Sequence, residues 1–131
     1  FAADVPDFAR RLIDAFWPGP LTLILPRRAG VGAAAAGGQD SIGLRCPSHP
    51  VAQALLRACA AQGVHGLAAP SANPFGRVSP TTAAHVQAGL GEALLVLDGG
   101  ACDVGIESTI VDCTRGAPVL LRPGGVSRAQ V

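Results

Sequence analysis

The chain has 131 residues, 49% of them hydrophobic and 15% charged, so it is long enough for one domain and too apolar for a disordered chain. Its formal net charge is +1, which gives no global electrostatic argument for binding nucleic acid or a membrane surface. All ten basic residues are arginine, which excludes a Walker-type phosphate loop because that loop needs a lysine.

The sequence contains no segment of the targeting or membrane-spanning type. Asp4 and Asp7 interrupt the opening, and no basic region precedes an apolar stretch, so the opening does not resemble a signal peptide. The longest strongly apolar runs, residues 21–25 and 93–97, are too short to span a bilayer. We therefore expect a soluble cytoplasmic protein. The four cysteines and three histidines lack zinc-site spacing, so we assign no metal ligand.

Three helices are predicted from apolar spacing and from residues that favour helix ends. The first follows Asp4, which is its expected cap. The second spans residues 50–62, with Ser48 before it and a proline in its first turn. The third spans residues 80–88, with Ser79 as the cap.

Strands are predicted where short apolar runs are bounded by proline, glycine or other turn residues. The six runs are residues 21–25, 41–45, 67–69, 94–97, 109–113 and 118–121. The last two flank a turn at Arg115-Gly116 and form a hairpin-like pair. Because helices and strands otherwise alternate, the sequence predicts an α/β fold with a mixed sheet.

Three segments place polar side chains beside proline or glycine at the ends of predicted strands, where open α/β sheets form ligand sites. The first segment ends at Arg45, whose guanidinium can hold a carboxylate or phosphate with two hydrogen bonds. A structural ion pair or a solvated surface arginine would also explain this residue. The local sequence therefore leaves the role of Arg45 open.

The second segment, residues 68–82, carries Ser71, Asn73 and Ser79 among small residues. The helix predicted after Ser79 would point its free N–H groups toward this loop, which suits an anion. Ordinary turn and cap chemistry is the alternative, and it accounts for Ser79 better than for Ser71.

The third segment combines residues 105–111, at the start of one strand of the predicted hairpin, with residues 121–125, at the end of the other. Ser108 and Thr109 begin one strand and Arg122 leaves the other, so the hydroxyls and the guanidinium should lie close together. Alone this is a weak signal, because Thr109 also suits a strand through its β-propensity.

Five motifs follow one another along essentially the whole chain. They are Phe16-Trp-Pro-Gly-Pro-Leu-Thr-Leu-Ile-Leu25, Ile42-Gly-Leu-Arg45-Cys-Pro-Ser-His-Pro50, Ala69-Pro-Ser71-Ala-Asn73, Glu107-Ser108-Thr109 and Leu121-Arg122-Pro-Gly124. Together they resemble the YrdC-like family, and the last two look most like its threonylcarbamoyl-AMP synthase branch. The resemblance implies a twisted mixed sheet flanked by helices, with residues 1–131 as the C-terminal portion of a single YrdC-like domain.

The resemblance also implies a reaction. L-Threonine, bicarbonate and ATP would give L-threonylcarbamoyl-AMP and pyrophosphate. A tRNA-modifying transferase complex would then move the threonylcarbamoyl group to an adenosine of tRNA, so RNA contact is a further expectation. Mg²⁺ is expected to assist the ATP chemistry, and no membrane partner is implied.

Roles for individual residues follow from the motif match. Arg45 would bind the threonine carboxylate, and the Ala69 main chain and Ser108 would line the same site. Arg122 would meet the ATP phosphates. The full set of expected ATP-binding residues is Ser41, Ser71, Asn73, Ser79 and Arg122.

One family motif is absent from this sequence. The family carries Lys-x-Arg upstream of the segment that begins at Trp17, and this chain starts with Phe1 after that point. Those basic residues would help neutralise the ATP phosphates. We therefore assign no catalytic residue and expect a truncated domain, incomplete at its N-terminus, with little or no activity alone.

Two other functions remain open at this stage. A YrdC-like domain of a carbamoyltransferase, such as the hydrogenase maturation protein, would handle carbamoyl-adenylate, and the upstream reading frame would distinguish it. A non-catalytic nucleotide- or RNA-binding module would bind ATP or RNA without regard to threonine. The near-neutral charge argues mildly against RNA.

Overall fold

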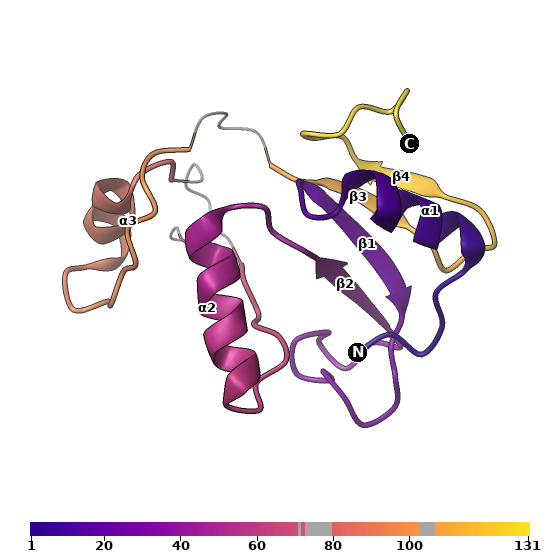
Figure 1. The fold of residues 1–131 in the computed structure, drawn as a ribbon, viewed down its shortest axis with the longest axis horizontal. Helices are drawn as coiled ribbons and strands as arrows, with labels where there is room; N and C mark the ends of the chain where they lie inside the picture. Colours follow the sequence, from indigo (N-terminus) through magenta and orange to yellow (C-terminus); the bar gives the residue numbers. More distant parts are fainter. Residues whose placement is uncertain (71, 73–79, 103–106) are drawn as a thin grey trace. The chain divides into compact units, whose positions relative to one another are not determined.

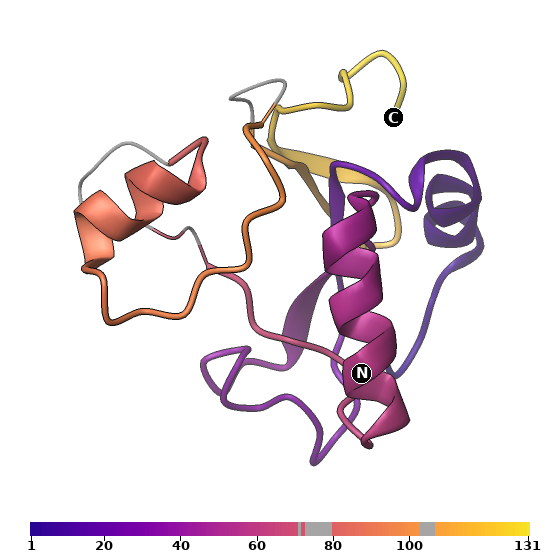
Figure 2. The same cartoon turned by 60° about the vertical axis from the view of Figure 1, so that its left-hand side comes forward.

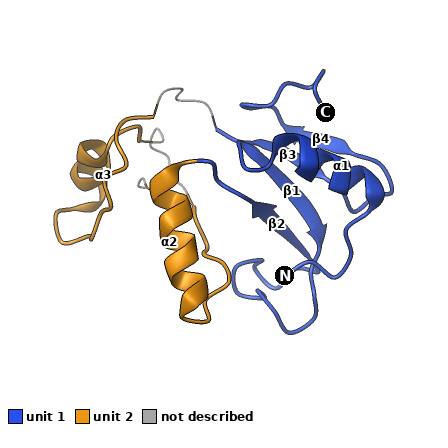
Figure 3. Ribbon diagram, in the orientation of Figure 1, with its two compact units in different colours: residues 1–48, 106–131 blue, residues 49–105 orange. Residues whose placement is uncertain are grey.

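The computed structural model describes residues 1–70, 72, 80–102 and 107–131, and the chain forms two compact units (Figure 3). Unit 1 comprises Phe1–Ser48 and Ile106–Val131, and unit 2 comprises His49–Gly105. Three of the expected site residues, Ser71, Asn73 and Ser79, lie outside the described residues. The single domain expected over the whole chain stays a prediction.

Unit 1 is built on a four-stranded mixed sheet with the strand order β2-β1-β3-β4 (Figure 1). The central strand β1 (Leu21–Pro26) runs antiparallel to β2 (Ser41–Arg45) and parallel to β3 (Thr109–Asp112). β4 (Val119–Arg122) pairs antiparallel with β3. The structure confirms the predicted mixed sheet, the closing hairpin and the position of these four strands, each within one residue at either end.

Helix α1 (Asp7–Phe16) covers one face of this sheet (Figure 1, Figure 2). Buried residues alternate along β1 and lie three residues apart on α1. Together with buried residues from β3 onward they form the core, which comprises Ala9, Leu12, Leu21, Leu23, Leu25, Val111, Cys113 and Val126. Fully burying a leucine stabilises a fold by about 2 kcal/mol, so β1, with three of them, contributes most to this core. Because strand side chains alternate between faces, Thr22 and Ile24 project from the other face.

The first helix starts later than the sequence predicted. It begins at Asp7 with Pro6 at the N-cap position, and no side chain caps it, so the expected cap role of Asp4 is wrong. Proline suits a helix start because its fixed φ is compatible with the first turn. Asp7 places a carboxylate in that turn, where it interacts favourably with the helix dipole.

Unit 2 contains α2 (Pro50–Ala61) and α3 (Ala83–Leu90). The predicted helix 50–62 is confirmed, but its cap is His49, whose Nδ1 accepts the Val51 N–H at 3.1 Å, and not Ser48. The same imidazole is fixed on its other side, because Nε2 lies 2.9 Å from the Gly99 main-chain oxygen.

The third helix begins at Ala83, three residues after the predicted start at Pro80. The Thr82 hydroxyl accepts the His85 N–H at 3.1 Å and caps the helix at that point. A threonine with a side-chain bond to the first turn therefore sets the boundary, and the expected cap Ser79 lies outside the described residues.

Two predicted strands, residues 67–69 and 94–97, are wrong: neither segment forms a strand. Leu95 is 87% exposed, so the apolar run at 94–97 is not a buried strand either. An extended segment becomes a strand only when a neighbour pairs with its N–H and C=O groups, and no segment described in unit 2 does so. No described helix has the length and hydropathy needed to cross a bilayer.

Candidate functional site

The face of the sheet opposite α1 carries Thr22, Arg45 and Arg122. In the β1–β2 register Thr22 pairs with Arg45, and in the β3–β4 register Ile110 pairs with Arg122. Paired residues project to the same side of a sheet with Cβ atoms about 5 Å apart. Thr22 and Arg45 are therefore direct neighbours on this face.

Arg45 is the last residue of β2, and its side chain is anchored by the turn between α1 and β1. Its Nε donates to the Gly19 main-chain oxygen at 3.1 Å, and the Gly19 N–H donates to the Cys46 oxygen at 2.8 Å. The ion pairs found in the described ranges belong to Arg115 and Arg122. Within those ranges, Arg45 is thus an exposed, oriented guanidinium and not part of a structural ion pair.

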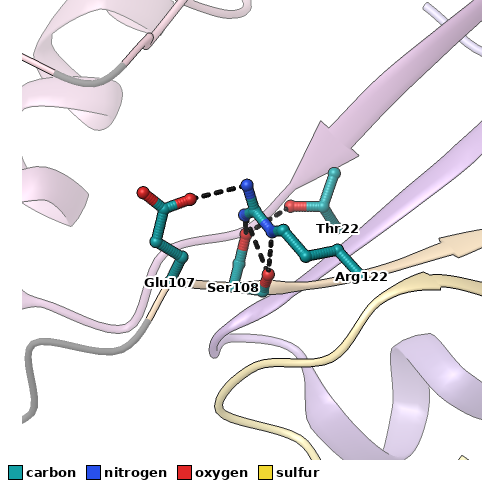
Figure 4. A network of polar contacts seen from close by, with 4 residues as sticks. All are labelled: Thr22, Glu107, Ser108 and Arg122. Carbon is teal, nitrogen blue, oxygen red and sulfur yellow. Dashed lines mark hydrogen bonds and ion pairs between the residues drawn. The ribbon is translucent and has the colours of Figure 1, made fainter. Parts of the chain in front are cut away.

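Ser108 and Arg122 are in contact, as the hairpin in the sequence predicted (Figure 4). The arginine donates to the Ser108 main-chain oxygen from Nε at 3.0 Å and from Nη2 at 2.8 Å. Nη2 also donates to the Ser108 hydroxyl at 3.2 Å. Charge-assisted bonds of this kind are stronger than neutral ones, so Arg122 holds the segment before β3 against the end of β4.

The remaining nitrogen of Arg122, Nη1, lies 2.6 Å from Oε2 of Glu107 (Figure 4). The two side chains are 41% and 45% exposed. Ion pairs this exposed contribute about 0–1 kcal/mol, because water and salt screen them. Sequence reasoning missed this pair, although the predicted hairpin brings residue 107 near residue 122.

Thr22 is a further member of the cluster that sequence reasoning missed. Its Oγ1 lies 3.0 Å from the Ser108 hydroxyl oxygen, across the β1–β3 pairing (Figure 4). The alternation of buried Leu21, Leu23 and Leu25 was the available signal, because it places Thr22 on the face opposite the core.

Within unit 1, Ser41 is not in this cluster. Ser41 pairs with Pro26 at the opposite end of β2 from Arg45, about 14 Å along the strand. Ala69 lies in unit 2, in an exposed segment outside the helices. The structure therefore brings Ser108 and Arg122 into contact. Thr22 contacts Ser108 and is paired with Arg45 between β1 and β2.

The conformation of the Glu107–Ser108 segment is fixed by two close contacts with the chain that follows β4. Thr109 Oγ1 donates to the Val126 oxygen at 2.6 Å and accepts the Val126 N–H at 2.9 Å, while the threonine is fully buried. At Gly124 an added Cβ would lie 2.6 Å from the Ser108 carbonyl carbon, so the glycine permits this approach. Thr109 is thus structural.

Two ionisable groups near the other end of β3 have shifted pKa values. Hydrogen bonds from the Thr114 side chain and main chain, with smaller help from Arg115, hold the pKa of Asp112 below its ordinary value despite its burial. Burial, and then the neighbouring Asp112, raise the pKa of the Cys113 thiol to about 11. Cys113 therefore stays protonated at neutral pH and packs as a small apolar residue.

The chain is similar to one protein family and to several of its members. The family model Sua5_yciO_yrdC, described as "Telomere recombination", matches residues 1–124. A threonylcarbamoyl-AMP synthase from Pyrococcus abyssi is 41% identical over 131 residues, covering 99% of this chain and 37% of that protein. The Bacillus subtilis threonylcarbamoyl-AMP synthase is 42% identical over 128 residues, covering 96% and 36%. The chain thus spans little more than a third of these two relatives.

Solved structures agree with the fold predicted from the motifs. The crystal structure of P. abyssi Sua5 complexed with L-threonine superimposes with a TM-score of 0.87 at 42% identity, covering 95% of this chain and 36% of that one. Escherichia coli YciO gives a TM-score of 0.74 at 28% identity, covering 92% and 58%. The mixed sheet and helices are those of the YrdC-like fold, and the chain belongs to the Sua5/YciO/YrdC family.

Proposed function

We propose that the protein synthesises L-threonylcarbamoyl-AMP from L-threonine, bicarbonate and ATP, with release of pyrophosphate. Two relatives above 40% identity carry the name threonylcarbamoyl-AMP synthase, and a structural relative was solved with L-threonine. The observation that carries the proposal is the arrangement of one sheet face. There an oriented Arg45 lies in register with Thr22, and Thr22 touches Ser108.

In this proposal Arg45 binds the threonine carboxylate. A guanidinium already held at Nε by the Gly19 oxygen loses little further freedom when a carboxylate binds to its remaining N–H groups. The Ser108 hydroxyl and the Ala69 main chain supply hydrogen bonds to the same amino acid. Charged and neutral partners together would orient threonine for reaction.

The nucleotide would meet Arg122 at its phosphates, with Ser41, Ser71, Asn73 and Ser79 as further ATP contacts. Negative charge moves onto the departing pyrophosphate, and a fixed guanidinium stabilises such charge without reorganising. Because Nε and Nη2 of Arg122 are bound to Ser108, Nη1 is the nitrogen that would face the phosphates.

Magnesium is expected to accompany ATP, and its protein ligands are not assigned. Across residues 1–70, 72, 80–102 and 107–131 no three His, Cys, Asp or Glu side chains are grouped as metal ligands. Mg²⁺ bound through substrate phosphates and water needs few protein ligands. No step of the proposed reaction is assigned to it here.

A tRNA-modifying transferase complex would consume the product and transfer the threonylcarbamoyl group to an adenosine of tRNA. The net charge of +1 gives the chain no strong general attraction for RNA. Any RNA contact would therefore be local or provided by the partner.

The test is pyrophosphate release by the complete reading frame that contains this chain, with threonine, bicarbonate and ATP each omitted in turn. Release that requires all three supports the synthase. Release that is indifferent to threonine favours the carbamoyltransferase instead, and no release from well-folded protein favours the binding module. Arg45→Ala should weaken threonine use at least tenfold, whereas Arg10→Ala, an exposed arginine of α1, should not.

A further inference from the structure

We propose that Thr22 is a positioning residue of the amino-acid site, and that its hydroxyl, paired with the Ser108 hydroxyl, fixes the direction of the one O–H that the pair donates to an oxygen of the bound threonine. This inference rests on the proposed function. It adds a residue on β1 to a site otherwise expected on β2, on the segment before β3, and at Ala69.

The first observation is the set of bonds around one oxygen atom. The Ser108 hydroxyl oxygen lies 3.0 Å from Thr22 Oγ1 and accepts a hydrogen bond from Arg122 Nη2 at 3.2 Å. A hydroxyl has one proton and two acceptor lone pairs. When Thr22 donates, both acceptor positions of Ser108 are filled, and the Ser108 proton must turn away toward a third group.

The opposite polarity would have a similar consequence. When Ser108 donates to Thr22, the Thr22 proton is the one left over. The pair holds two protons and uses one between its members, so it offers one O–H donor to a ligand in either case. Arg122 can only donate, which keeps this count unchanged. An oxygen of threonine is the complementary acceptor.

The second observation is that the Thr22 side chain has a defined orientation. An added Cβ at Gly43 would lie 3.4 Å from the Thr22 methyl carbon, so the methyl group points toward β2 while the hydroxyl points toward Ser108 on the β3 side. A β-branched residue has few χ1 rotamers in a strand. The direction of the Thr22 hydroxyl is thus set by the backbone of β1.

The third observation is the register with Arg45, which makes Thr22 the neighbour of the expected carboxylate-binding residue. Side chains paired in this way have Cβ atoms about 5 Å apart. That spacing matches the few bonds that separate the carboxylate and side-chain hydroxyl of one amino acid. A single small ligand can therefore contact both Arg45 and the hydroxyl pair.

A purely structural role is the alternative, because hydroxyl pairs across strands also stabilise sheets. The two roles differ in what a variant loses. Loss of a purely structural hydroxyl would lower the free energy of unfolding and would not change the affinity for threonine. A positioning hydroxyl would change affinity for threonine and leave nucleotide affinity alone.

The experiment uses calorimetry on the complete reading frame to measure L-threonine and ATP binding by the wild type, Thr22→Val and Thr22→Ser. We expect Thr22→Val to weaken threonine binding about fivefold and Thr22→Ser to retain wild-type threonine binding, with ATP affinity unchanged in both. Thr114→Val is the matched control, because it removes a hydroxyl that bonds to Asp112 Oδ1 at 2.6 Å beyond β3. It should lower stability and leave threonine affinity intact.

Equal threonine affinity in Thr22→Val and the wild type would overturn the inference. So would a parallel loss of threonine and ATP binding together with a lower melting temperature. If Thr22→Val does not fold, Thr22→Ala and Thr22→Ser are compared, and equal threonine binding by these two overturns the inference. A wild type that does not bind threonine would instead remove the proposed function on which the inference rests.

Discussion

Arg122 donates two hydrogen bonds to the main-chain oxygen of Ser108, from Nε at 3.0 Å and Nη2 at 2.8 Å. The guanidinium is therefore a structural part of the Glu107–Ser108 segment as well as a candidate phosphate ligand. One arginine at the end of β4 would serve both substrates, because the same segment carries the hydroxyl proposed for threonine.

This double role predicts the behaviour of Arg122→Lys. Lysine keeps the charge but cannot make the planar, two-nitrogen contact with one oxygen, so the Ser108 segment should lose its support. We expect threonine and ATP affinity each to fall by about tenfold, as measured by calorimetry. A loss confined to ATP would contradict the positioning role and leave Arg122 as a phosphate ligand alone.

Glu107→Gln should change ATP binding in the opposite direction. If Arg122 Nη1 binds phosphate, the phosphate competes for this nitrogen with the Glu107 carboxylate, which pairs with it at 2.6 Å and repels the phosphate charge. The pair is exposed and weak, and Ser108 holds the other nitrogens, so Arg122 keeps its orientation in the variant. We expect about two- to fivefold tighter ATP binding at low salt and a smaller gain at high salt.

The control for this prediction is Glu92→Gln, which removes the other glutamate of the chain, an exposed residue of unit 2. It should leave ATP affinity unchanged. Weaker ATP binding by Glu107→Gln would mean that the carboxylate positions Arg122, and the competition argument would be wrong.

The sequence predicted the sheet of unit 1 well because its signals were redundant. β1 is a short apolar run that ends at Pro26, and the hairpin of β3 and β4 has a turn at Arg115-Gly116. The contact of Ser108 with Arg122 followed from that hairpin alone. These are local patterns, and their structural consequences are local or nearly so.

The two wrong strands and the missed Thr22 contact have one physical cause: each depends on partners distant in sequence. Residues 94–97 have the composition of a strand, yet a short apolar run does not specify a pairing neighbour. Thr22 has no local signal for its partner Ser108, which lies 86 residues away. Site residues of this kind become visible only when the register of the sheet is known.

Gly124→Ala tests whether the close approach behind Ser108 matters. An added Cβ would meet the Glu107 oxygen and would lie 2.6 Å from both the Ser108 carbonyl carbon and the Thr109 nitrogen, so main chain would have to move. We expect a loss of stability of about 1–3 kcal/mol in chemical denaturation, together with weaker threonine binding. Gly43→Ala is the stability control, because its Cβ would make an ordinary contact at 3.4 Å. Equal stability in the two variants would show that the segment tolerates displacement.

Asp112 should make stability depend on pH in the acid range. Its pKa is lowered chiefly by two hydrogen bonds from Thr114, so the charged form is favoured in the folded protein. A depressed pKa contributes stability that is complete above the ordinary value of 3.8 and is lost as the pH falls through the folded value. At neutral pH Asp112→Asn should cost about 1–2 kcal/mol of unfolding free energy.

The difference between the wild type and Asp112→Asn should therefore shrink as the pH is lowered below 3.8, because the wild-type carboxyl then becomes neutral too. Chemical denaturation at neutral and acid pH measures it. Arg115→Gln is the control: its guanidinium is 67% exposed and lies 3.0 Å from Oδ2, so removing it should cost less than about 0.5 kcal/mol. The stability difference between the wild type and Asp112→Asn could instead stay constant with pH. That result would show that the Thr114 hydrogen bonds do not depend on the charge of Asp112.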